Sequence, residues 1–144
     1  MIREANARWG GDLRKGSGTM ALGSGAFEGR YSFRSRFEDG PGTNPEELIG
    51  AAHAGCFSMA FSNMLAQAGH EPTLVQTTAR VHIGPVDGKP TISLIELVCE
   101  GDVPGIDPET FQKIAGEAKE GCPVSRALAS VEITLEASLV GAEK

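Results

Sequence analysis

Residues 44–69 read NPEELIGAAHAGCFSMAFSNMLAQAG, and this stretch decides the fold of the chain. Asn44 is a favoured helix cap, Pro45 suits the first helical position, and the two glutamates that follow complement the helix dipole. Gly69 is a typical C-terminal stop, so we predict a helix of about 25 residues that is roughly 37 Å long. Because residues 48–69 contain no Asp, Glu, Lys or Arg, we expect protein to cover most sides of this central helix.

A membrane span is the alternative interpretation of the uncharged segment, because its length fits a bilayer. Its content argues against a span, since Ser58, Ser62 and Asn63 interrupt it and acidic residues precede it. The chain opens with the charged sequence Met1-Ile2-Arg3-Glu4, shows no secretory leader, and has an odd number of cysteines, three. We therefore expect a soluble protein of the reducing cytoplasm.

The residues before the helix predict an antiparallel β meander over 1–40. Short apolar runs alternate there with glycine turns, and Phe27, Tyr31 and Phe33 follow one another at even spacing, as in a strand with one inward face. A loop over 38–42 then separates the meander from the helix.

The residues after the helix predict a hairpin, further helices and a last strand. Alternating apolar and polar residues around the turn Asp87-Gly88 indicate the hairpin, and Asp107-Pro108 is a typical helix start. The predicted elements are a β hairpin over 73–100, helices over 107–129 and a strand over 130–140. Since this order has no regular βαβ alternation, we expect residues 1–144 to form a single α+β domain with a mainly antiparallel sheet.

Composition and residue spacing exclude two classes of function. The net charge is −6, with 13 basic and 19 acidic residues, so a basic stripe for nucleic acid is not expected. No CxxC or HxxxH pair is present, and His53, His70 and His82 are scattered over different elements. We expect neither a metal nor any other cofactor.

The cysteines are the residues with the clearest chemical potential. A lone cysteine such as Cys56, on an apolar helix, is most often a small buried hydrophobe, and Cys99 in a strand has the same explanation. Cys122 differs, because it directly precedes Pro123 at a predicted helix start, where free backbone amides favour a thiolate. Because cysteine is not a favoured capping residue, structure alone does not explain Cys122. Together with Cys56 in the apolar helix, its placement indicates paired redox chemistry.

A thiolate at Cys56, in the middle of a helix, gains little from the helix dipole and needs a cation. Arginine suits this role, and Glu46 or Glu47 can hold its planar fork in place. The basic candidates that precede the helix are Arg14, Lys15, Arg30, Arg34 and Arg36. His53, three residues before Cys56, leaves open a Cys/His nucleophilic pair.

The stretch from Asn44 to Ala60, followed by Cys122-Pro123-Val124-Ser125, resembles the OsmC branch of the OsmC/Ohr family of thiol-dependent peroxidases. The resemblance covers nearly the whole chain and includes Trp9-x-Gly11-Asp12, Arg36-Phe37-Glu38 and Val103-Pro104-Gly105-Ile106. It implies an OsmC-like α+β fold with a mainly antiparallel sheet and long central helices, assembled as an intertwined cytoplasmic homodimer.

The same resemblance implies roles for individual residues. Cys56 is then the peroxide-attacking thiol, Cys122 the resolving thiol, and Arg36 with Glu46 the activating pair. The sister Ohr branch takes its arginine from an earlier loop, and Arg14 and Lys15 in the matching stretch therefore remain candidates. The implied partners are an organic hydroperoxide substrate and an external dithiol of the lipoyl type, without metal, nucleic acid or membrane.

The reaction expected is reduction of an alkyl or lipid hydroperoxide to an alcohol through a Cys56 sulfenic acid and a Cys56–Cys122 disulfide, which the dithiol reopens. Phe57, Met59 and Phe61 are expected to wall the pocket and to favour organic peroxides over hydrogen peroxide. Two alternatives are a thiol-based oxidant sensor or stress protein without catalysis, and a Cys/His hydrolase that uses His53.

One hypothesis comes from helix geometry. If Glu46 and Cys56 lie on one continuous helix, ten residues separate them by about 15 Å along the axis, too far to share an arginine within one subunit. We therefore expect two antiparallel copies of the helix to pack about a two-fold axis and to make composite sites.

Overall fold

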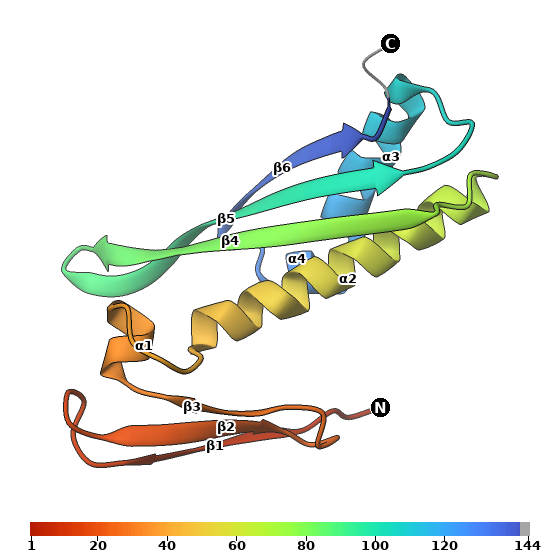
Figure 1. The fold of residues 1–144 in the computed structure, drawn as a ribbon. Coiled ribbons are helices and arrows are strands. Elements are labelled where there is room, and N and C mark those ends of the chain that lie inside the picture. Colours follow the sequence, from red (N-terminus) through yellow and green to blue (C-terminus); the bar gives the residue numbers. More distant parts are fainter. Residues whose placement is uncertain (142–144) are drawn as a thin grey trace. The chain divides into compact units, whose positions relative to one another are not determined.

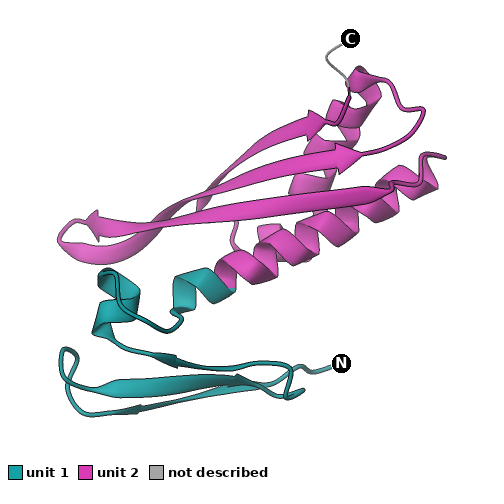
Figure 2. Cartoon of the chain, viewed as in Figure 1, with its two compact units in different colours: residues 1–48 teal, residues 49–144 magenta. Residues whose placement is uncertain are grey.

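The computed structural model describes residues 1–141. The chain divides into two compact units, Met1–Leu48 and Ile49–Lys144, which Figure 2 colours separately. Each unit has its own three-stranded sheet.

The sheet of the first unit is an antiparallel meander, as expected. It contains β1 (Ala5–Gly10), β2 (Ser17–Leu22) and β3 (Glu28–Tyr31) in that order (Figure 1). Trp9 and Tyr31 pack on one face with ring centroids 5.3 Å apart. Gly18 lies between them, and a Cβ there would come within 2.8 Å of the Tyr31 ring, which explains the glycine.

The prediction that Phe33 continues a strand is wrong. Residues Phe33–Phe37 form the short helix α1, because Ser32 and Ser35 make a capping box. The Ser35 amide donates to Ser32 Oγ at 3.2 Å, and the Ser32 amide donates to Ser35 Oγ at 2.9 Å. The meander therefore ends before residue 40.

The central helix α2 spans Pro45–Gln67, 23 residues without interruption. The Glu47 amide donates to Asn44 Oδ1 at 2.7 Å, so Asn44 is the cap that the sequence predicts. Gly69 follows the helix with a φ of +91°, the conformation of a glycine stop. By length and composition α2 also qualifies as a membrane span, a test that core helices of soluble proteins pass as well.

The second unit combines a hairpin, two helices and a last strand. Its elements are β4 (Leu74–Val86), β5 (Lys89–Asp102), α3 (Pro108–Gly121), α4 (Pro123–Ala127) and β6 (Glu132–Leu139). The hairpin turns at Asp87 and Gly88, both at positive φ, and Asp107 caps α3 through the Thr110 amide at 2.9 Å. These elements lie where the sequence predicts them.

The sheet of the second unit is mixed. Its order is β4-β5-β6, with β4 antiparallel and β6 parallel to β5. A parallel neighbour requires a long crossover, and α3 and α4 provide it. The sheets are thus mainly antiparallel, with one parallel pair that the element order alone did not reveal.

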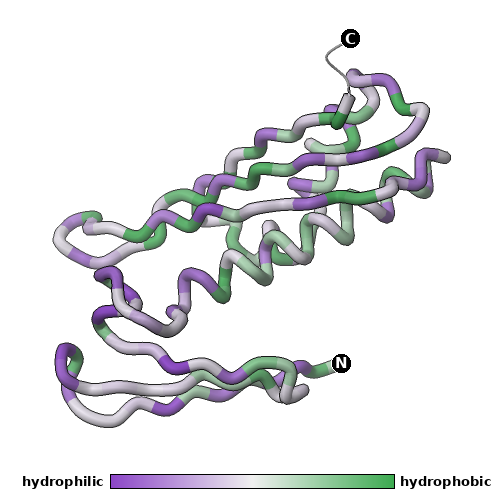
Figure 3. The backbone as a smooth tube through the Cα atoms, in the orientation of Figure 1, coloured by the Kyte–Doolittle hydropathy of each residue, from purple (hydrophilic) through white to green (hydrophobic). Residues whose placement is uncertain are grey.

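The core of the second unit lies on one face of its sheet, where α2 and α3 cover β5. Its fully buried side chains include Phe57, Phe61 and Leu65 from α2, Ile95, Leu97 and Cys99 from β5, and Phe111 from α3. Hydrophilic and hydrophobic residues alternate along β4 and β6 (Figure 3), so the opposite face of the sheet is mostly polar at these two strands. This core fixes the face of α2 that carries Cys56.

Candidate active site

The sulfurs of Cys56 and Cys122 lie 2.8 Å apart, although the two residues are 66 positions apart in the sequence. Both are free thiols. Cys56 on α2 is half-buried, whereas Cys122 is fully buried. In this contact, the half-buried thiol of Cys56 is accessible to solvent, whereas the buried thiol of Cys122 is not.

The position of Cys122 follows from two helices that meet at this residue. Its amide donates to the Ala118 carbonyl at 3.0 Å and closes α3, and Pro123 then occupies the first position of α4. Ala118 is itself fully buried in the core. Cys122 is therefore held against α2 by the packing of α3.

The two thiols differ in acidity. Burial raises the pKa of Cys122, but hydrogen bonds with the Cys56 side chain and with the amide and hydroxyl of Ser125 outweigh it and leave the pKa below its usual value. Burial raises the pKa of Cys56, and the hydrogen bond to Cys122 adds to this increase. Cys122 is thus the more easily ionised thiol, and Cys56 needs a cation to react as a thiolate.

Arg36 and Glu46 form a bidentate ion pair. Arg36 Nε donates to Glu46 Oε1 at 3.1 Å, and Arg36 Nη2 donates to Oε2 at 2.7 Å. Glu46 is only 5% exposed. Glu47 instead accepts a hydrogen bond from the Thr43 hydroxyl at 2.7 Å, so Glu46 is the carboxylate that holds the arginine.

The other basic candidates have different surroundings. The Arg14 guanidinium lies 4.5 Å from the centre of the Phe33 ring, and Arg34 forms an exposed ion pair with Glu38 at 3.8 Å. Lys15 uses its backbone amide, which donates to Asp12 Oδ1. Arg30 lies on β3, along a hollow of the first sheet. Arg36 is thus the one candidate of the five that a buried carboxylate orients within the described residues.

Glu46 and Cys56 lie on the same uninterrupted helix, ten residues apart. Regular helix geometry separates them by about 15 Å along the axis. The structure therefore brings together two pairs, the thiols and the ion pair, and α2 holds Glu46 and Cys56 apart from one another within one chain.

Comparison with known proteins identifies the family. The family model described as OsmC-like protein matches residues 38–136. This chain belongs to the OsmC family. It is 51% identical over 138 residues to peroxiredoxin OsmC of Escherichia coli (strain K12), a match that covers 95% of this chain and 96% of the relative.

More distant proteins resemble this chain in sequence or in structure. The chain is 36% identical over 98 residues to an organic hydroperoxide resistance protein of Xanthomonas axonopodis pv. citri, 67% of either chain. The crystal structure of the organic hydroperoxide resistance protein OhrB of Bacillus subtilis matches with a TM-score of 0.77 and 25% identity, over 96% of this chain and 98% of that one. The expected family and α+β fold class are confirmed.

The structure also places three residues of this OsmC-family chain that the sequence left open. His53 Nε2 is hydrogen-bonded to Ser125 Oγ at 2.8 Å rather than to Cys56. Ser125 was not among the predicted site residues, although its place three residues after Cys122, at the start of a helix, was a usable signal. Cys99 is fully buried in the core, and burial raises the pKa of its thiol.

The expected apolar walls of the pocket are partly wrong. Phe57 and Phe61 are fully buried, with ring centroids 5.5 Å apart, because they pack into the core. They cannot line a peroxide pocket. Met59 is 77% exposed and remains available for an apolar wall.

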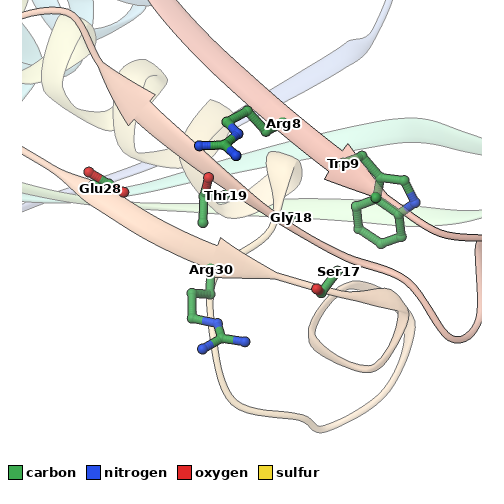
Figure 4. Close-up of a pocket in the computed structure, with 8 residues that line it drawn as sticks. Arg8, Trp9, Ser17, Gly18, Thr19, Glu28 and Arg30 are labelled. Carbon is green, nitrogen blue, oxygen red and sulfur yellow. The ribbon is translucent and has the colours of Figure 1, made fainter.

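A separate hollow of about 420 Å³ lies on the sheet of the first unit (Figure 4). Arg8, Thr19 and Arg30 are register partners across β1, β2 and β3 and lie along it. No thiol is among the described residues that line this hollow, so it is distinct from the Cys56–Cys122 contact.

Proposed function

We propose that this OsmC-family protein is a thiol-dependent peroxidase that reduces organic hydroperoxides to alcohols, with Cys56 as the attacking thiol and Cys122 as the resolving one. The single observation that carries the proposal is the 2.8 Å contact between a half-buried and a fully buried free thiol. The names of the relatives, a peroxiredoxin and organic hydroperoxide resistance proteins, support the same activity.

The first half-reaction oxidises Cys56. Its thiolate attacks the distal oxygen of the hydroperoxide, the O–O bond breaks, and the alkoxide leaves as an alcohol after taking a proton. Cys56 becomes a sulfenic acid. The attack requires the thiolate, whereas burial and Cys122 raise the pKa of Cys56, so an activating cation is part of the proposal.

The second half-reaction forms the disulfide. The Cys122 thiolate attacks the sulfenic sulfur of Cys56, an S–S bond replaces the S–O bond, and hydroxide leaves as water after protonation. The sulfurs need to approach by only about 0.8 Å from their present separation to reach disulfide length. An external dithiol then supplies two electrons and restores both thiols.

Arg36, held by Glu46, is the proposed cation, and it acts in a homodimer. Because Glu46 and Cys56 are ten residues apart on α2, an antiparallel second copy of the helix supplies the missing half of each site. Uncharged residues of α2 that are exposed in the single chain support such packing; they are Ala51, Ala52, Gly55 and Met59. We therefore propose that this apolar face of α2 packs against a second copy of the chain.

The dimer has a direct test with a matched control. A Cβ at Gly55 would meet nothing within 4 Å in its own chain. Gly55→Ala should therefore leave the fold of the single chain intact, while Gly55→Glu places a charge in the proposed interface. We expect the Gly55→Glu protein to be monomeric, folded and inactive, and an active monomer would overturn the composite site.

Steady-state turnover tests the function itself. We expect many turnovers of cumene hydroperoxide per protein, faster than with hydrogen peroxide, and faster with a lipoyl-type dithiol than with glutathione. The cytoplasm, where thiols stay reduced, is the proposed compartment. A sensor without catalysis would consume about one peroxide per site and stop even with dithiol present.

A further inference from the structure

Two contacts join α2 to the first turn of α4. Cys56 and Cys122 meet at 2.8 Å, and His53 Nε2 and Ser125 Oγ also meet at 2.8 Å. On each helix the two residues are three positions apart, so they lie on one face, a single turn from one another. Residue 53 faces 125 and residue 56 faces 122, so the histidine contact lies directly beside the thiols.

The histidine is fully buried and incompletely bonded. His53 has no exposed surface, and Ser125 is only 6% exposed. Within residues 1–141, His53 Nδ1 is a buried nitrogen without a hydrogen-bond partner. Burial also lowers the pKa of His53. The ring is therefore neutral near pH 7 and has a single N–H proton to place.

Counting hydrogen bonds decides where that proton lies. With the proton on Nε2, His53 donates to Ser125 Oγ, and the Ser125 hydroxyl proton is free to point at Cys122. With the proton on Nδ1, a buried N–H has no acceptor, and the Ser125 hydroxyl must donate to Nε2 instead. Buried N–H groups without acceptors are rarer and costlier than an unfilled lone pair, which favours the Nε2–H form.

We propose that His53 is a positioning residue whose Nε2–H orients the Ser125 hydroxyl so that it donates to Cys122 Sγ when this sulfur is a thiolate. The His53–Ser125 contact stands on its geometry, the hydrogen bond from Ser125 to the Cys122 thiolate is the proposed part, and its catalytic consequence rests on the proposed function. The titratable groups around Cys122 in the second unit are Cys56 and, through Ser125, His53.

The surroundings of Cys122 are consistent with donors arranged for a charged sulfur. The amide and hydroxyl of Ser125 and the amide of Val124 lower the pKa of Cys122. Cys122 occupies the cap position of α4 but makes no side-chain capping hydrogen bond as a neutral thiol. These donors therefore act mainly on the thiolate.

The peroxidase cycle uses the Cys122 thiolate twice. It attacks the Cys56 sulfenic acid, as described above. It also leaves when an external thiolate attacks the half-buried Cys56 sulfur of the disulfide, forming a mixed disulfide with Cys56 and releasing Cys122 with the electron pair of the broken bond. Because Cys122 is fully buried, the incoming thiol meets Cys56 first.

The proposal is tested by NMR on the full-length protein. Nitrogen-15 shifts of His53 report the tautomer, and titration of carbon-13-labelled cysteine Cβ in a Cys56→Ser background reports the pKa of Cys122 without its coupling to Cys56, with Cys99 as a separate signal. We expect the Nε2–H tautomer and a Cys122 pKa that Ser125→Ala or His53→Leu raises by about one unit. The double variant should match the single ones, because both break one chain.

Two comparison variants separate positioning from packing. His53→Gln keeps an N–H donor near the place of Nε2 and should retain most of the pKa effect. His82→Gln alters a histidine on the polar face of β4, bonded to Glu96, and should leave Cys122 unchanged. In single turnovers, Ser125→Ala should slow the loss of the Cys56 sulfenic acid about threefold. A higher Cys122 pKa lowers the fraction of Cys122 that is a thiolate, but it also makes each thiolate more nucleophilic, which partly offsets the loss.

The Nδ1–H tautomer, or a Cys122 pKa unchanged in Ser125→Ala, would overturn the proposal. If His53→Leu does not fold, the wild-type tautomer and the Ser125→Ala titration still decide. Failure of the proposed function looks different: a wild-type protein without peroxide turnover, but with the tautomer and pKa shifts as expected, would leave the hydrogen-bond chain standing and remove only its catalytic consequence.

Discussion

Replacing Glu46 by glutamine tests the activating pair at its most buried point. Glu46 accepts two hydrogen bonds from Arg36, at 3.1 and 2.7 Å, with its side chain 7% exposed and that of Arg36 36% exposed. A hydrogen bond to a charged group contributes about 1.5–3 kcal/mol when buried. Because Arg36 is partly solvated, we expect Glu46→Gln to remove about 2 kcal/mol of stabilisation from the two hydrogen bonds together.

This loss should appear in the first half-reaction. If the orientation of Arg36 activates Cys56, about 2 kcal/mol corresponds to a roughly 10- to 30-fold slower oxidation of Cys56 by cumene hydroperoxide. The assay is a single-turnover stopped-flow measurement with reduced protein and excess peroxide. Arg36→Lys keeps the charge but loses the fork, and should slow the reaction comparably.

Glu47→Gln is the matched control, because Glu47 is next in sequence but accepts from the Thr43 hydroxyl, a bond that an amide oxygen can also accept. Its rate should stay within about twofold of wild type, since surface substitutions of this kind change little. A Glu46→Gln protein that reacts at the wild-type rate, or a Glu47→Gln protein that is equally slow, would refute the assignment of Glu46.

Three further predictions follow from the same structure. Cys122→Ser should consume one peroxide and accumulate a Cys56 sulfenic acid that a dimedone-type probe labels, and peroxide turnover that persists in this variant would refute Cys122 as the resolving thiol. Gly101→Ala should destabilise the protein by about 1–3 kcal/mol in urea unfolding, because its Cβ would lie 2.7 Å from Phe111 Cε1 inside the core; a neutral effect would show that Phe111 moves freely. Burial lowers the pKa of His53 below 6.5, so below that pH the unfolded chain gains a proton that the folded chain lacks. The free energy of unfolding should therefore fall as the pH is lowered through 6.5. In the His53→Gln variant it should fall less steeply with pH, and equal slopes in the variant and the wild type would contradict a buried neutral histidine.

Local signals made much of the fold predictable. Asn44 and Gly69 mark the two ends of α2 through capping and a positive φ, and Asp87-Gly88 marks the hairpin turn. Such signals act over a few residues, so the sequence alone reveals them. The helix α1 was not predicted, because the even spacing of Phe27, Tyr31 and Phe33 also suits a strand. In the structure the Ser32–Ser35 capping box starts a helix there instead.

Features that depend on tertiary packing were harder to predict. The direction of β6 depends on how α3 and α4 cross the sheet, which element order does not specify. Phe57 and Phe61 were assigned to a pocket because they flank the cysteine in sequence, but on α2 they point into the core.

The candidate site also contains residues that the sequence indicated and a contact that only tertiary packing creates. The placement of Cys56 and Cys122 in the sequence indicated a redox pair, whereas the choice of Arg36 and Glu46 came from the family resemblance, and the roles of all four residues stay predictions. The bond between His53 and Ser125 spans 72 positions and depends on how α4 meets α2. No local pattern in the sequence encodes such a contact.

Peptide mapping after one equivalent of cumene hydroperoxide tests the central claim most directly. The account predicts a protein lighter by two hydrogen atoms, with one disulfide joining Cys56 to Cys122 and with Cys99 still a free thiol, and dithiol should restore the starting mass. A disulfide that includes Cys99, a lasting sulfinic acid at Cys56, or thiols left unoxidised would contradict it.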